Sequence, residues 1–412
     1  MLEALSTKSI NVSDKVFITG IGIISSIGFN YDEVAFALKS TRSGIGNITL
    51  LDTIYKDEIL AAEVKATDKE LKEISKVNSN ISYSRTALLG IIAAKQAMIS
   101  AGISDNKGFR TGLVSATTVG GMDRSEKFYK EYLKNKSRGR LSDIITHDCA
   151  SSTEIIADEL SIHDYVSTIS TACSSSANAI MLGSRLIENG ILDSVLVGGV
   201  DALTIFTLNG FNSLMILDRT GCKPFDEERN GLTLGEGAGF LMIESEQSVR
   251  QKGTSPLCEI KGYGNACDAF HQTALSPEGE GAFLSMQKAV NKAGIKPEMI
   301  DYINAHGTGT KNNDLSEGTA IQRLFKGQIP PFSSTKSYTG HTLGAAGAIE
   351  AIFCVLALKN KWIYPNLNFK QPMTGLGFSP VTSFGLNINL QNVMSNSFGF
   401  GGNNTSLIFS QP

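Results

Sequence analysis

Tyr165-Val-Ser-Thr-Ile-Ser-Thr-Ala-Cys-Ser-Ser-Ser176 joins the pattern of a β-strand to the pattern of an α-helix through a short turn. The first seven residues are rich in β-branched side chains, which is typical of a buried strand. Small and apolar residues then recur at helical spacing and end at a glycine, which favours a helix: Ala177, Ile180, Met181, Ser184, Ile187 and Gly190. Strand–turn–helix units of this kind build α/β folds.

Cys173 occupies the turn of this unit, and its position suggests a reactive thiol. On the first turn of a helix, free backbone N–H groups and the helix dipole favour a thiolate. A lone cysteine is more commonly a buried structural residue. The segment by itself therefore leaves two interpretations open, a nucleophile and a core residue.

Composition limits the class of protein. The chain has 412 residues, 42% hydrophobic and 19% charged, with a formal net charge of −3. This length can bury a large core and suggests two or more packed units. The near-neutral charge gives no case for binding nucleic acid or a membrane surface. Six cysteines without a CxxC pair or metal-ligand spacing predict reduced thiols, no bound metal and a cytoplasmic protein. We also expect no signal peptide and no membrane span.

Short β-branched runs alternate with longer helical patterns, and the alternation restarts after about residue 253. We therefore predict an α/β protein with an N-terminal half at 1–253 and a C-terminal half at 254–412. The halves share a pattern rather than residues, so the pattern alone suggests a duplicated fold. Gly20-Ile-Gly22 follows the first strand pattern, but Ser25 stands where a dinucleotide-binding motif needs its third glycine. A tight strand-to-loop turn is the better interpretation.

Two of the five histidines lie in glycine-rich loops that follow strand patterns. His306 begins such a loop, whose glycines let backbone approach a ligand while Thr308 and Thr310 offer hydroxyls. His341 precedes a predicted helix over 342–358, and a helix N-terminus favours the neutral imidazole. Each histidine alone is more commonly structural. Together with the cysteine in the same kind of turn, they indicate a catalytic site.

A third glycine-rich loop, Asn396-Ser-Phe-Gly-Phe-Gly-Gly402, lies near the C-terminus. Its glycines allow a sharp turn that can point the N–H of Phe400 into a site, as an oxyanion hole requires. The alternative is an ordinary glycine turn before the last predicted strand, Ser406–Ser410.

Several ionic residues lie in or near these motifs. Glu350 follows Lys336 by fourteen positions in an apolar run, where a carboxylate is costly unless it is paired. Asp314 and Glu317 follow the His306 loop three residues apart, on one face of a helical turn. They could orient Lys336 or bind a cation, and a solvated helix start is the commoner alternative.

The segment from Arg124 to Arg140 carries seven Lys or Arg against two Glu, a local charge of +5. Four aromatic and aliphatic residues are interleaved with these charges: Phe128, Tyr129, Tyr132 and Leu133. Such a run is usually a solvated face. It also suggests a docking surface for an acidic partner, with Arg124, Lys127 and Lys130 as candidates.

Four motifs in order resemble the β-ketoacyl-[acyl-carrier-protein] synthases of the thiolase superfamily: Thr171-Ala-Cys-Ser-Ser175, His306-Gly-Thr-Gly-Thr310, Lys336-Ser-Tyr-Thr-Gly-His341 with Gly344-Ala-Ala-Gly347, and Asn396 to Gly402. Lys223-Pro-Phe-Asp226 with Gly235-Glu-Gly-Ala-Gly239 also resembles a family segment. The resemblance covers essentially the whole chain. It implies a thiolase-type fold of two similar halves in α-β-α-β-α layers, usually as a dimer.

This resemblance implies decarboxylative Claisen condensation of an acyl group with a malonyl thioester, both carried on the phosphopantetheine arm of an acyl carrier protein. Cys173 would be the nucleophile that takes the acyl group. His306 and His341 would hold the malonyl thioester and stabilise the enolate. Lys336 would support the second histidine, with Glu350 as its ionic partner.

The resemblance also assigns the remaining candidates. The backbone N–H groups of Cys173 and Phe400 would form the oxyanion hole, and Phe400 would gate acyl entry. Thr308 and Thr310 would contact the pantetheine arm. Lys223 matches a position where elongating synthases often carry a carrier-binding arginine. No bound cofactor is expected, because this decarboxylation needs only placed N–H donors near the enolate.

The Cys-His-His set resembles the elongating type, because initiating synthases place an asparagine where this chain has His341. Cys354 lacks the Cys-x-Gly motif of a thiolase. The segments Ser115–Met122 and Asp201–Phe211 look more like the synthases of aryl polyene or pigment clusters than like housekeeping ones. Ordinary fatty-acid elongation is the competing interpretation.

Two other functions stay open at this point. One is a non-catalytic, chain-length-factor-like subunit of a synthase heterodimer. The other is a malonyl-carrier decarboxylase that performs no condensation. The resemblance leaves open whether the dimer partner is a second copy or a synthase-like paralogue.

Overall fold

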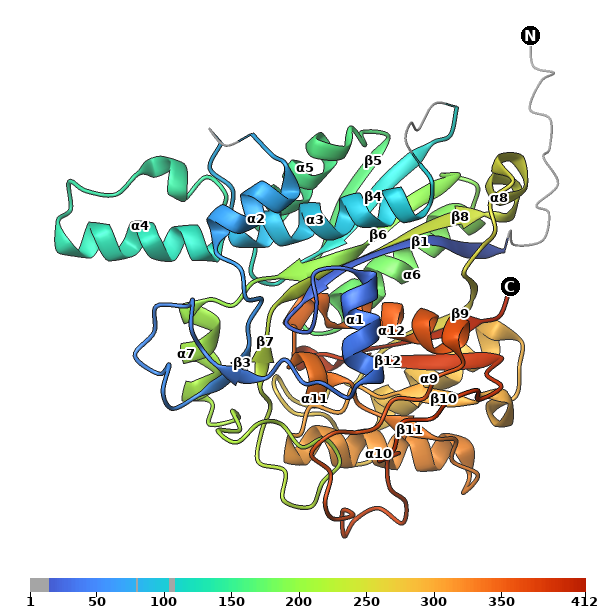
Figure 1. The fold of residues 1–412 in the computed structure, drawn as a ribbon. Helices are drawn as coiled ribbons and strands as arrows, with labels where there is room; N and C mark the ends of the chain where they lie inside the picture. Colours follow the sequence, from blue (N-terminus) through green and yellow to red (C-terminus); the bar gives the residue numbers. More distant parts are fainter. Residues whose placement is uncertain (1–14, 79–80, 104–107) are drawn as a thin grey trace.

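The computed structural model describes residues 15–78, 81–103 and 108–412. Within these residues, ten strands form one mixed sheet in the order β11-β10-β12-β13-β9-β1-β8-β6-β4-β5 (Figure 1). Their bounds are β1 (Val16–Ser25), β4 (Thr111–Ala116), β5 (Tyr165–Ile169), β6 (Ser194–Asp201), β8 (Gly237–Ser245), β9 (Cys258–Cys267), β10 (Tyr302–Asn304), β11 (Phe332–Ser333), β12 (Asn392–Phe398) and β13 (Asn403–Ser410). A small second sheet contains β2 (Gly46–Asn47), β3 (Leu60–Ala62) and β7 (Leu234–Gly235).

The large sheet repeats one topology twice. Read outward from its middle, the first half is β1-β8-β6-β4-β5 and the second is β9-β13-β12-β10-β11. In each half the first two pairings are antiparallel and the last two are parallel. The halves join where Phe17 pairs with Glu259 and Ile18 with Cys258. The repeat confirms the predicted fold of two similar halves.

Helices form three layers around the two halves of the sheet (Figure 1). One outer layer contains α3 (Arg85–Ser100) and α5 (Cys149–Leu160), the middle layer α6 (Ser175–Glu188) and α12 (Ala346–Asn360), and the other outer layer α9 (Glu280–Ala293) and α10 (Lys311–Phe325). The remaining helices are α1 (Tyr31–Lys39), α2 (Asp68–Ser75), α4 (Met122–Lys134), α7 (Ile205–Ser213), α8 (Glu246–Lys252), α11 (Lys336–Thr339) and the 3-10 turns η1 (Leu141–Asp143), η2 (Pro297–Met299), η3 (Leu343–Ala345) and η4 (Phe400–Gly402).

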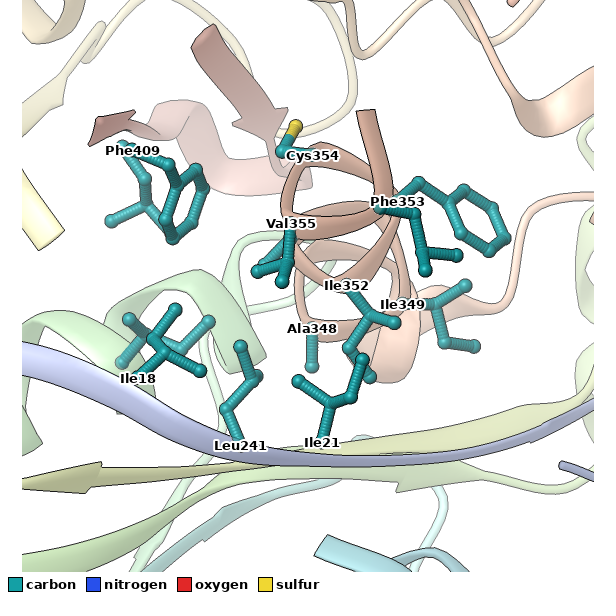
Figure 2. Packing of buried hydrophobic residues seen from close by; sticks show 14 of the residues in the cluster. Ile18, Ile21, Leu241, Ala348, Ile349, Ile352, Phe353, Cys354, Val355 and Phe409 are labelled. Carbon is teal, nitrogen blue, oxygen red and sulfur yellow. The ribbon is translucent and has the colours of Figure 1, made fainter. Parts of the chain in front are cut away.

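The middle layer is the most deeply buried part of the fold. Figure 2 shows α12 with Ile352 and its neighbours above Ile21 and Leu241 of the sheet. Leu343–Asn360 is long and apolar enough to cross a membrane by length and composition, but 89% of it is buried inside the protein, as in a core helix. The sequence predicts one helix over 342–358, whereas the structure has the η3 turn followed by α12.

Gly20 and Gly22 lie inside β1 rather than in a turn, so the interpretation as a strand-to-loop turn is wrong. A Cβ at Gly20 would lie 2.3 Å from the carbonyl oxygen of Ala97, and one at Gly22 would lie 2.0 Å from that of Ala93. The glycines therefore let α3 pack directly on the strand. Dense packing of this kind leaves no room for a side chain.

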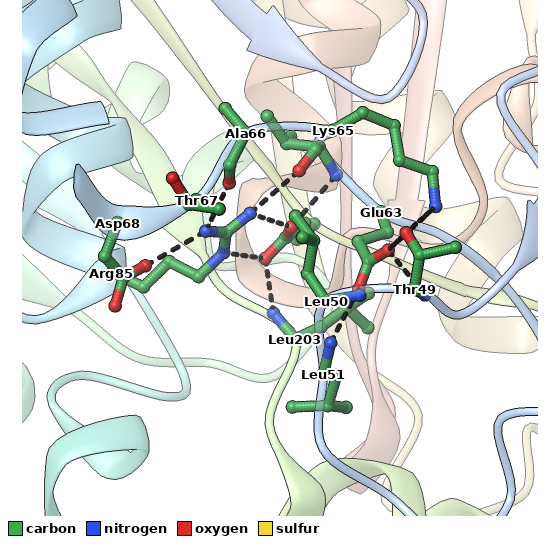
Figure 3. Close-up of polar contacts among 12 residues, drawn as sticks. Thr49, Leu50, Leu51, Glu63, Lys65, Ala66, Thr67, Asp68, Arg85 and Leu203 are labelled. Carbon is green, nitrogen blue, oxygen red and sulfur yellow. Dashed lines mark hydrogen bonds and ion pairs between the residues drawn. The ribbon is translucent and has the colours of Figure 1, made fainter. Parts of the chain in front are cut away.

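An ion-pair cluster ties the first turn of α3 to the small sheet (Figure 3). Arg85 donates to both carboxylate oxygens of Glu236, at 2.9 and 2.7 Å, and also pairs with Asp68 at 3.0 Å. Glu63 accepts from the backbone N–H groups of Thr49, Leu50 and Leu51 and pairs with Lys65. These bonds satisfy carboxylates that burial would otherwise penalise.

Two segments of the fold, β5 and α4, are themselves exposed to solvent. The strand β5 is the edge of the large sheet and is half-exposed, so the prediction of a buried strand is wrong for it. None of the thirteen residues of α4, all in the described part of the chain, is buried. Figure 1 shows α4 projecting from the body.

Candidate active site

Cys173 lies in the tight turn between β5 and α6. The preceding residue, Ala172, has φ = 53°, a left-handed conformation that residues with a Cβ rarely adopt. The helix begins at Ser175, with Ser174 as its N-cap residue. Cys173 is 6% exposed as a whole residue and lines a cavity of about 540 Å³. The thiol is therefore buried in protein but faces a space that a ligand can enter.

The two histidines meet the cysteine in this cavity. Nε2 of His341 lies 3.0 Å from Sγ of Cys173. The rings of His306 and His341 lie edge to face, with centroids 5.3 Å apart. Both rings are buried and both line the cavity. Three turns that are far apart in the sequence therefore present one thiol and two imidazoles to the same space.

Lys336 completes the buried cluster. Its Nζ lies 2.5 Å from Oε1 of Glu350 and 3.2 Å from Nδ1 of His306. The side chains of Lys336 and Glu350 are 1% and 3% exposed, so the ion pair expected from the apolar run is present and buried. The prediction that Lys336 supports the second histidine, His341, is wrong. The resemblance assigned Lys336 to His341, whereas the fold points its ammonium to the ring of the first histidine.

The contact with Lys336 fixes the tautomer of His306. An ammonium group can only donate hydrogen bonds, so Nδ1 of His306 accepts and Nε2 carries the ring proton. One ligand atom from each of Cys173, His306 and His341 lies within 4.8 Å of the others, a spacing that could suit a metal ion. A protonated Nε2 has no lone pair for a metal, which does not suit such a site. The absence of a bound metal remains a prediction.

Both imidazoles are neutral. Burial lowers the pKa of His306 and of His341 well below the usual value, and the charge of Lys336 acts in the same direction. The sequence predicts a neutral His341 from a helix N-terminus. The neutral state agrees, but α12 begins five residues further on, at Ala346, and burial is the main cause.

Burial raises the pKa of the Cys173 thiol to about 11, against the opposing effects of Lys336 and the backbone N–H of Phe400. The prediction of a thiolate favoured by the first turn of a helix is therefore wrong. Cys173 precedes the N-cap of α6, and desolvation of the charged sulfur outweighs the nearby donors. The resting site holds a neutral thiol beside a neutral imidazole, and the thiol can pass its proton to His341.

We expect alkylation of Cys173 by iodoacetamide to accelerate about tenfold per pH unit from pH 7 to pH 10, because the thiolate fraction rises tenfold per unit below the pKa. The sign follows from the raised pKa of about 11, since the reactive thiolate is gained only as the pH rises. Peptide mass spectrometry separates Cys173 from the exposed Cys267. A rate that levels off below pH 8 would contradict a neutral resting thiol.

The Phe400 loop packs directly against the nucleophile turn. The backbone N–H of Phe400 donates a hydrogen bond to the Cys173 sulfur. A Cβ at Gly399 would lie 3.0 Å from the carbonyl oxygen of Thr171 and 3.2 Å from the backbone nitrogen of Cys173. This close approach holds two backbone N–H groups beside one sulfur, as an oxyanion hole needs.

Replacing Gly399 with alanine is expected to lower the rate of acyl transfer by about 10²- to 10³-fold, the cost of one misplaced oxyanion-hole donor. The backbone of Gly399, at φ −106°, suits alanine, so the effect isolates the steric separation of the two turns. Single-turnover acylation measures it. Gly377→Ala is the matched control, because a Cβ at that position meets nothing within 4 Å. Equal rates for the two variants would exclude this role for the Phe400 loop.

Asp314 and Glu317 are fully buried and hold the His306 loop, so a solvated helix start is wrong for them. Glu317 accepts from the backbone N–H groups of His306 and Gly307, at 2.9 and 2.8 Å. Asp314 accepts from the backbone N–H groups of Phe225 and Gly309. Glu317 also accepts from the side-chain amide of Asn396, and Asp314 from that of Asn313, both at 3.1 Å. Lys336 is not among these donors, so the two carboxylates orient the His306 loop and not Lys336.

The two threonine hydroxyls of the His306 loop lie in the same cavity as Cys173. Thr308 and Thr310 both line the cavity, and their hydroxyls are 2.9 Å apart. Phe400 and Phe211 of α7 also line the cavity, and their rings stack with centroids 5.9 Å apart. The cavity therefore combines a polar wall with an aromatic wall.

The predicted docking residues lie in different places. Arg124 is largely buried and bonded to Asp143 and Ser82. Its charge is therefore used in contacts within the protein, around the start of α4. Lys127 and Lys130 are exposed on α4, where Lys130 pairs with Asp52 at 3.1 Å. None of these three residues is among those that line the Cys173 cavity.

Lys223 lies apart from α4. It is half-buried, and its backbone nitrogen lies 3.2 Å from the Cβ position of Gly309. It is therefore next to the His306 loop.

Sequence reasoning missed a buried amide network below the nucleophile. Oδ1 of Asn403 accepts from Ser174, Asn178 and Asn265, at 2.8, 2.8 and 2.9 Å. Its backbone oxygen accepts from Gly399 at 2.9 Å. Asn403 thus links the turn of Cys173 to the loop of Phe400. Asn178 of α6 and Asn265 of β9 lie in none of the sequence motifs.

Asp201 was also missed as a positioning residue. It is fully buried at the end of β6 and accepts from Thr117, Thr118 and Val119. It also accepts from the backbone N–H of Gly344, at 2.7 Å, three residues after His341. An acidic residue at the end of a strand pattern is the signal that could have identified it.

The repeated half-folds and the buried thiol–imidazole site define a thiol-dependent acyltransferase class with the thiolase-type fold. Residues 13–248 match the family model "Beta-ketoacyl synthase, N-terminal domain", and residues 257–370 match "Beta-ketoacyl synthase, C-terminal domain". The chain belongs to the β-ketoacyl synthase family.

Relatives and solved structures agree with this assignment. The chain is 36% identical to the 3-oxoacyl-[acyl-carrier-protein] synthase 2 of Staphylococcus aureus (strain N315), over 96% of this chain and 98% of the relative. It is similar to the solved ishigamide ketosynthase/chain length factor, with a TM-score of 0.92 and 31% identity, covering 97% and 100% of the two chains. It is also similar to a chain of AntDE:AntF, a type II PKS acyl-carrier protein in complex with its ketosynthase, with a TM-score of 0.87 and 25% identity, covering 97% and 100%.

Proposed function

We propose that this protein is an elongating 3-oxoacyl-[acyl-carrier-protein] synthase that holds an acyl group on Cys173 and condenses it with malonyl carrier protein. The observation that carries the proposal is the 3.0 Å contact between Sγ of Cys173 and Nε2 of His341, in a cavity shared with His306. A thiol beside a neutral imidazole suits thioester exchange. Family membership and the synthase 2 relatives support the same reaction.

In the first half-reaction, Cys173 gives its proton to His341 as the sulfur attacks the carbonyl carbon of the acyl thioester. The new C–S bond forms, and the bond to the carrier sulfur breaks. His341 then returns the proton to the departing carrier thiol. We assign the N–H groups of Cys173 and Phe400 to the oxyanion that forms between these steps; the hydrogen bond from Phe400 to the sulfur and the close approach of Gly399 support this assignment.

In the second half-reaction, the malonyl group loses CO2, and the electron pair of the broken C–C bond stays on the α-carbon as an enolate. The Nε2–H of His306, fixed by Lys336, donates to the thioester oxygen where this charge develops. The carbanion attacks the acyl carbonyl, a C–C bond forms, and the C–S bond to Cys173 breaks. The cysteine regains a proton from solvent. No cofactor takes part in these steps.

The other two functions are separable from this one. A chain-length-factor-like subunit needs no nucleophile, whereas this chain has Cys173 in contact with His341. A decarboxylase without condensation would release CO2 and leave no acyl group on the sulfur. Mixing the protein with an acyl carrier protein and measuring its intact mass decides the matter. An acyl adduct on Cys173 supports the synthase, and its absence refutes it.

The acyl chain belongs to the fatty-acyl or polyene class, and we propose the aryl polyene or pigment branch over housekeeping fatty-acid synthesis. The aromatic wall of Phe211 and Phe400 can stack on a planar conjugated chain, which supports this branch. Competition between saturated and polyunsaturated acyl carriers of equal length tests it. A preference for the saturated chain would contradict the polyene branch and favour ordinary fatty-acid elongation.

We propose that the protein acts in the cytoplasm as a dimer, with a second copy or a paralogue. The half-exposed edge strand β5 supports this, because an unpaired edge is a natural pairing site. The projecting segment formed by α4 and the turn η1 exposes Leu133, Leu141 and Ile145 at 66%, 69% and 74%, which a partner would cover.

Lys127 and Lys130 on α4 are proposed to attract the acidic carrier protein.

A further inference from the structure

Asn403 contacts both of the segments that carry the expected oxyanion-hole donors. It is the first residue of β13 and follows the glycine-rich turn η4 directly. Its backbone oxygen accepts from the N–H of Gly399 at 2.9 Å, next to Phe400. Its side-chain amide is hydrogen-bonded to the segment that contains Cys173. The separation of the two segments therefore depends on a single residue.

The amide of Asn403 holds the Cys173 turn on both sides of the cysteine. After the cysteine, the hydroxyl of Ser174 lies 2.8 Å from Oδ1 of Asn403. Before the cysteine, the contact runs through Asn178, whose amide donates to Oδ1 of Asn403 at 2.8 Å and to the hydroxyl of Thr171 at 2.9 Å. These bonds span the left-handed residue of the turn, a conformation that persists only when its surroundings fix it.

The remaining bonds of the network fix the orientation of each amide. Asn265 of β9 donates to Oδ1 of Asn403 and to the hydroxyl of Thr405, both at 2.9 Å. Thr405 in turn donates to Oδ1 of Asn178 at 2.7 Å. Asn178 is only 7% exposed, so loss of its acceptor would leave a buried donor unpaired. A polar network whose members are all paired is rigid.

Other residues hold the two histidines. His306 contacts Lys336, and its backbone N–H donates to Glu317. In the part of the chain that the structure describes, no hydrogen bond joins Asn403 to His306, His341 or Lys336. Loss of the Asn403 amide is therefore expected to disturb the oxyanion hole and leave the histidines in place.

From this geometry we propose that Asn403 is a positioning residue for acyl transfer, whose amide sets the separation between the Cys173 turn and the Phe400 loop. The inference deepens the proposed function and rests on it. A donor lowers the barrier only where negative charge develops, so a small shift of either segment slows acylation. The charge is absent from the bound thioester, so the same shift leaves binding almost unchanged.

The test compares Asn403→Leu, Asn403→Asp and Asn392→Leu. Leucine is close to asparagine in size but has no acceptor, whereas aspartate keeps an oxygen in the place of Oδ1. Asn392 is the matched control, because it is another hydrogen-bonded amide in the neighbouring strand β12. Its partners, Ser410 and Met299, lie neither in the Cys173 turn nor in the Phe400 loop. The quantities measured are the free energy of unfolding and the single-turnover acylation of Cys173 by increasing concentrations of hexanoyl carrier protein.

We expect Asn403→Leu to lower the maximal acylation rate about 10²-fold, the cost of one misplaced oxyanion-hole donor, and to change the half-saturating concentration less than about twofold. Asn403→Asp should keep most of the wild-type rate. Asn392→Leu should lose stability but not rate. Should Asn403→Leu fail to fold, Asn178→Ala decides the matter, because it removes only the link to Thr171 and should slow acylation about tenfold.

Three results would overturn the proposal. The first is a wild-type acylation rate in Asn403→Leu, or in Asn178→Ala where that variant replaces it. The second is an equal loss of rate in Asn392→Leu, which would assign the effect to general destabilisation. The third is an Asn403→Asp protein as slow as Asn403→Leu, because the acceptor would then not be the feature that matters.

Failure of the proposed function gives a different result, in which the wild-type protein itself gains no hexanoyl group. Alkylation of Cys173 by iodoacetamide at pH 9 then tests the same alignment. The N–H of Phe400 stabilises the thiolate and lowers the pKa of Cys173 against the effect of burial, so Asn403→Leu should be alkylated more slowly than Asn392→Leu. Equal alkylation rates would overturn the proposal.

Discussion

Replacing Cys173 with alanine is expected to abolish acyl transfer, with a loss of about 10⁴-fold or more, because removal of a nucleophile eliminates the covalent step. The variant should keep its fold, since the lost thiol is small and lines a cavity. Intact-protein mass after mixing with a hexanoyl carrier protein measures the result. The wild-type protein should gain one hexanoyl group, and Cys173→Ala should gain none.

Cys173→Gln is the informative companion variant. A glutamine amide can take the place of the acyl carbonyl, while His306 keeps its contact with Lys336. We expect this variant to release CO2 from malonyl carrier protein without condensing it. An acyl adduct that persists in either variant would show that another residue is the nucleophile. If Cys173→Gln released no CO2, the histidines would not be sufficient for decarboxylation.

Replacing Glu350 with leucine is expected to lower the free energy of unfolding by about 3–5 kcal/mol, because it leaves the charge of Lys336 buried without its counterion. The pair is 2.5 Å apart and almost fully buried, so solvent cannot replace the lost carboxylate. Burial raises the pKa of Glu350 against the opposing effect of Lys336, so each charge of this pair depends on the other. Chemical denaturation measures the loss.

Two controls separate the buried pair from ordinary ion pairs. Glu246→Leu removes one partner of the exposed Arg250 pair and should cost less than about 1 kcal/mol. The double variant Lys336→Met and Glu350→Leu should recover most of the stability, because two apolar side chains replace two buried charges. It should not recover decarboxylation, since His306 loses the ammonium that fixes its tautomer. A Glu350→Leu protein as stable as the wild type would show that the pair is hydrated in solution.

The glycine-rich turns made the site predictable. Cys173, His306, His341 and Phe400 each follow a strand pattern, and the ends of strands meet at one place in an α/β fold. The pairing of Lys336 with Glu350 was also predictable, because a carboxylate in an apolar run must find a partner. These are local signals, in which the chemistry of a residue conflicts with its surroundings.

Predictions that needed directions in space were wrong. Lys336 contacts His306 rather than His341. Asp314 and Glu317 are buried and bind the backbone of the His306 loop, whereas the sequence favoured solvated positions. Charge spacing along a chain cannot tell which backbone N–H groups a carboxylate will meet. The Asn403 network was not predictable for the same reason, since its members come from separate elements.

By itself, the sequence determined the α/β class, the order of the four motifs and the identity of the chemical groups. The fold class and the motifs depend on periodicity and on turn chemistry, and both are properties of short stretches of sequence. Only the tertiary structure decided the protonation state of Cys173. The sequence places the thiol near the start of a helix, which favours a thiolate, but the fold buries it and raises its pKa to about 11. Desolvation depends on all the atoms packed around a group, and those atoms come from the whole chain.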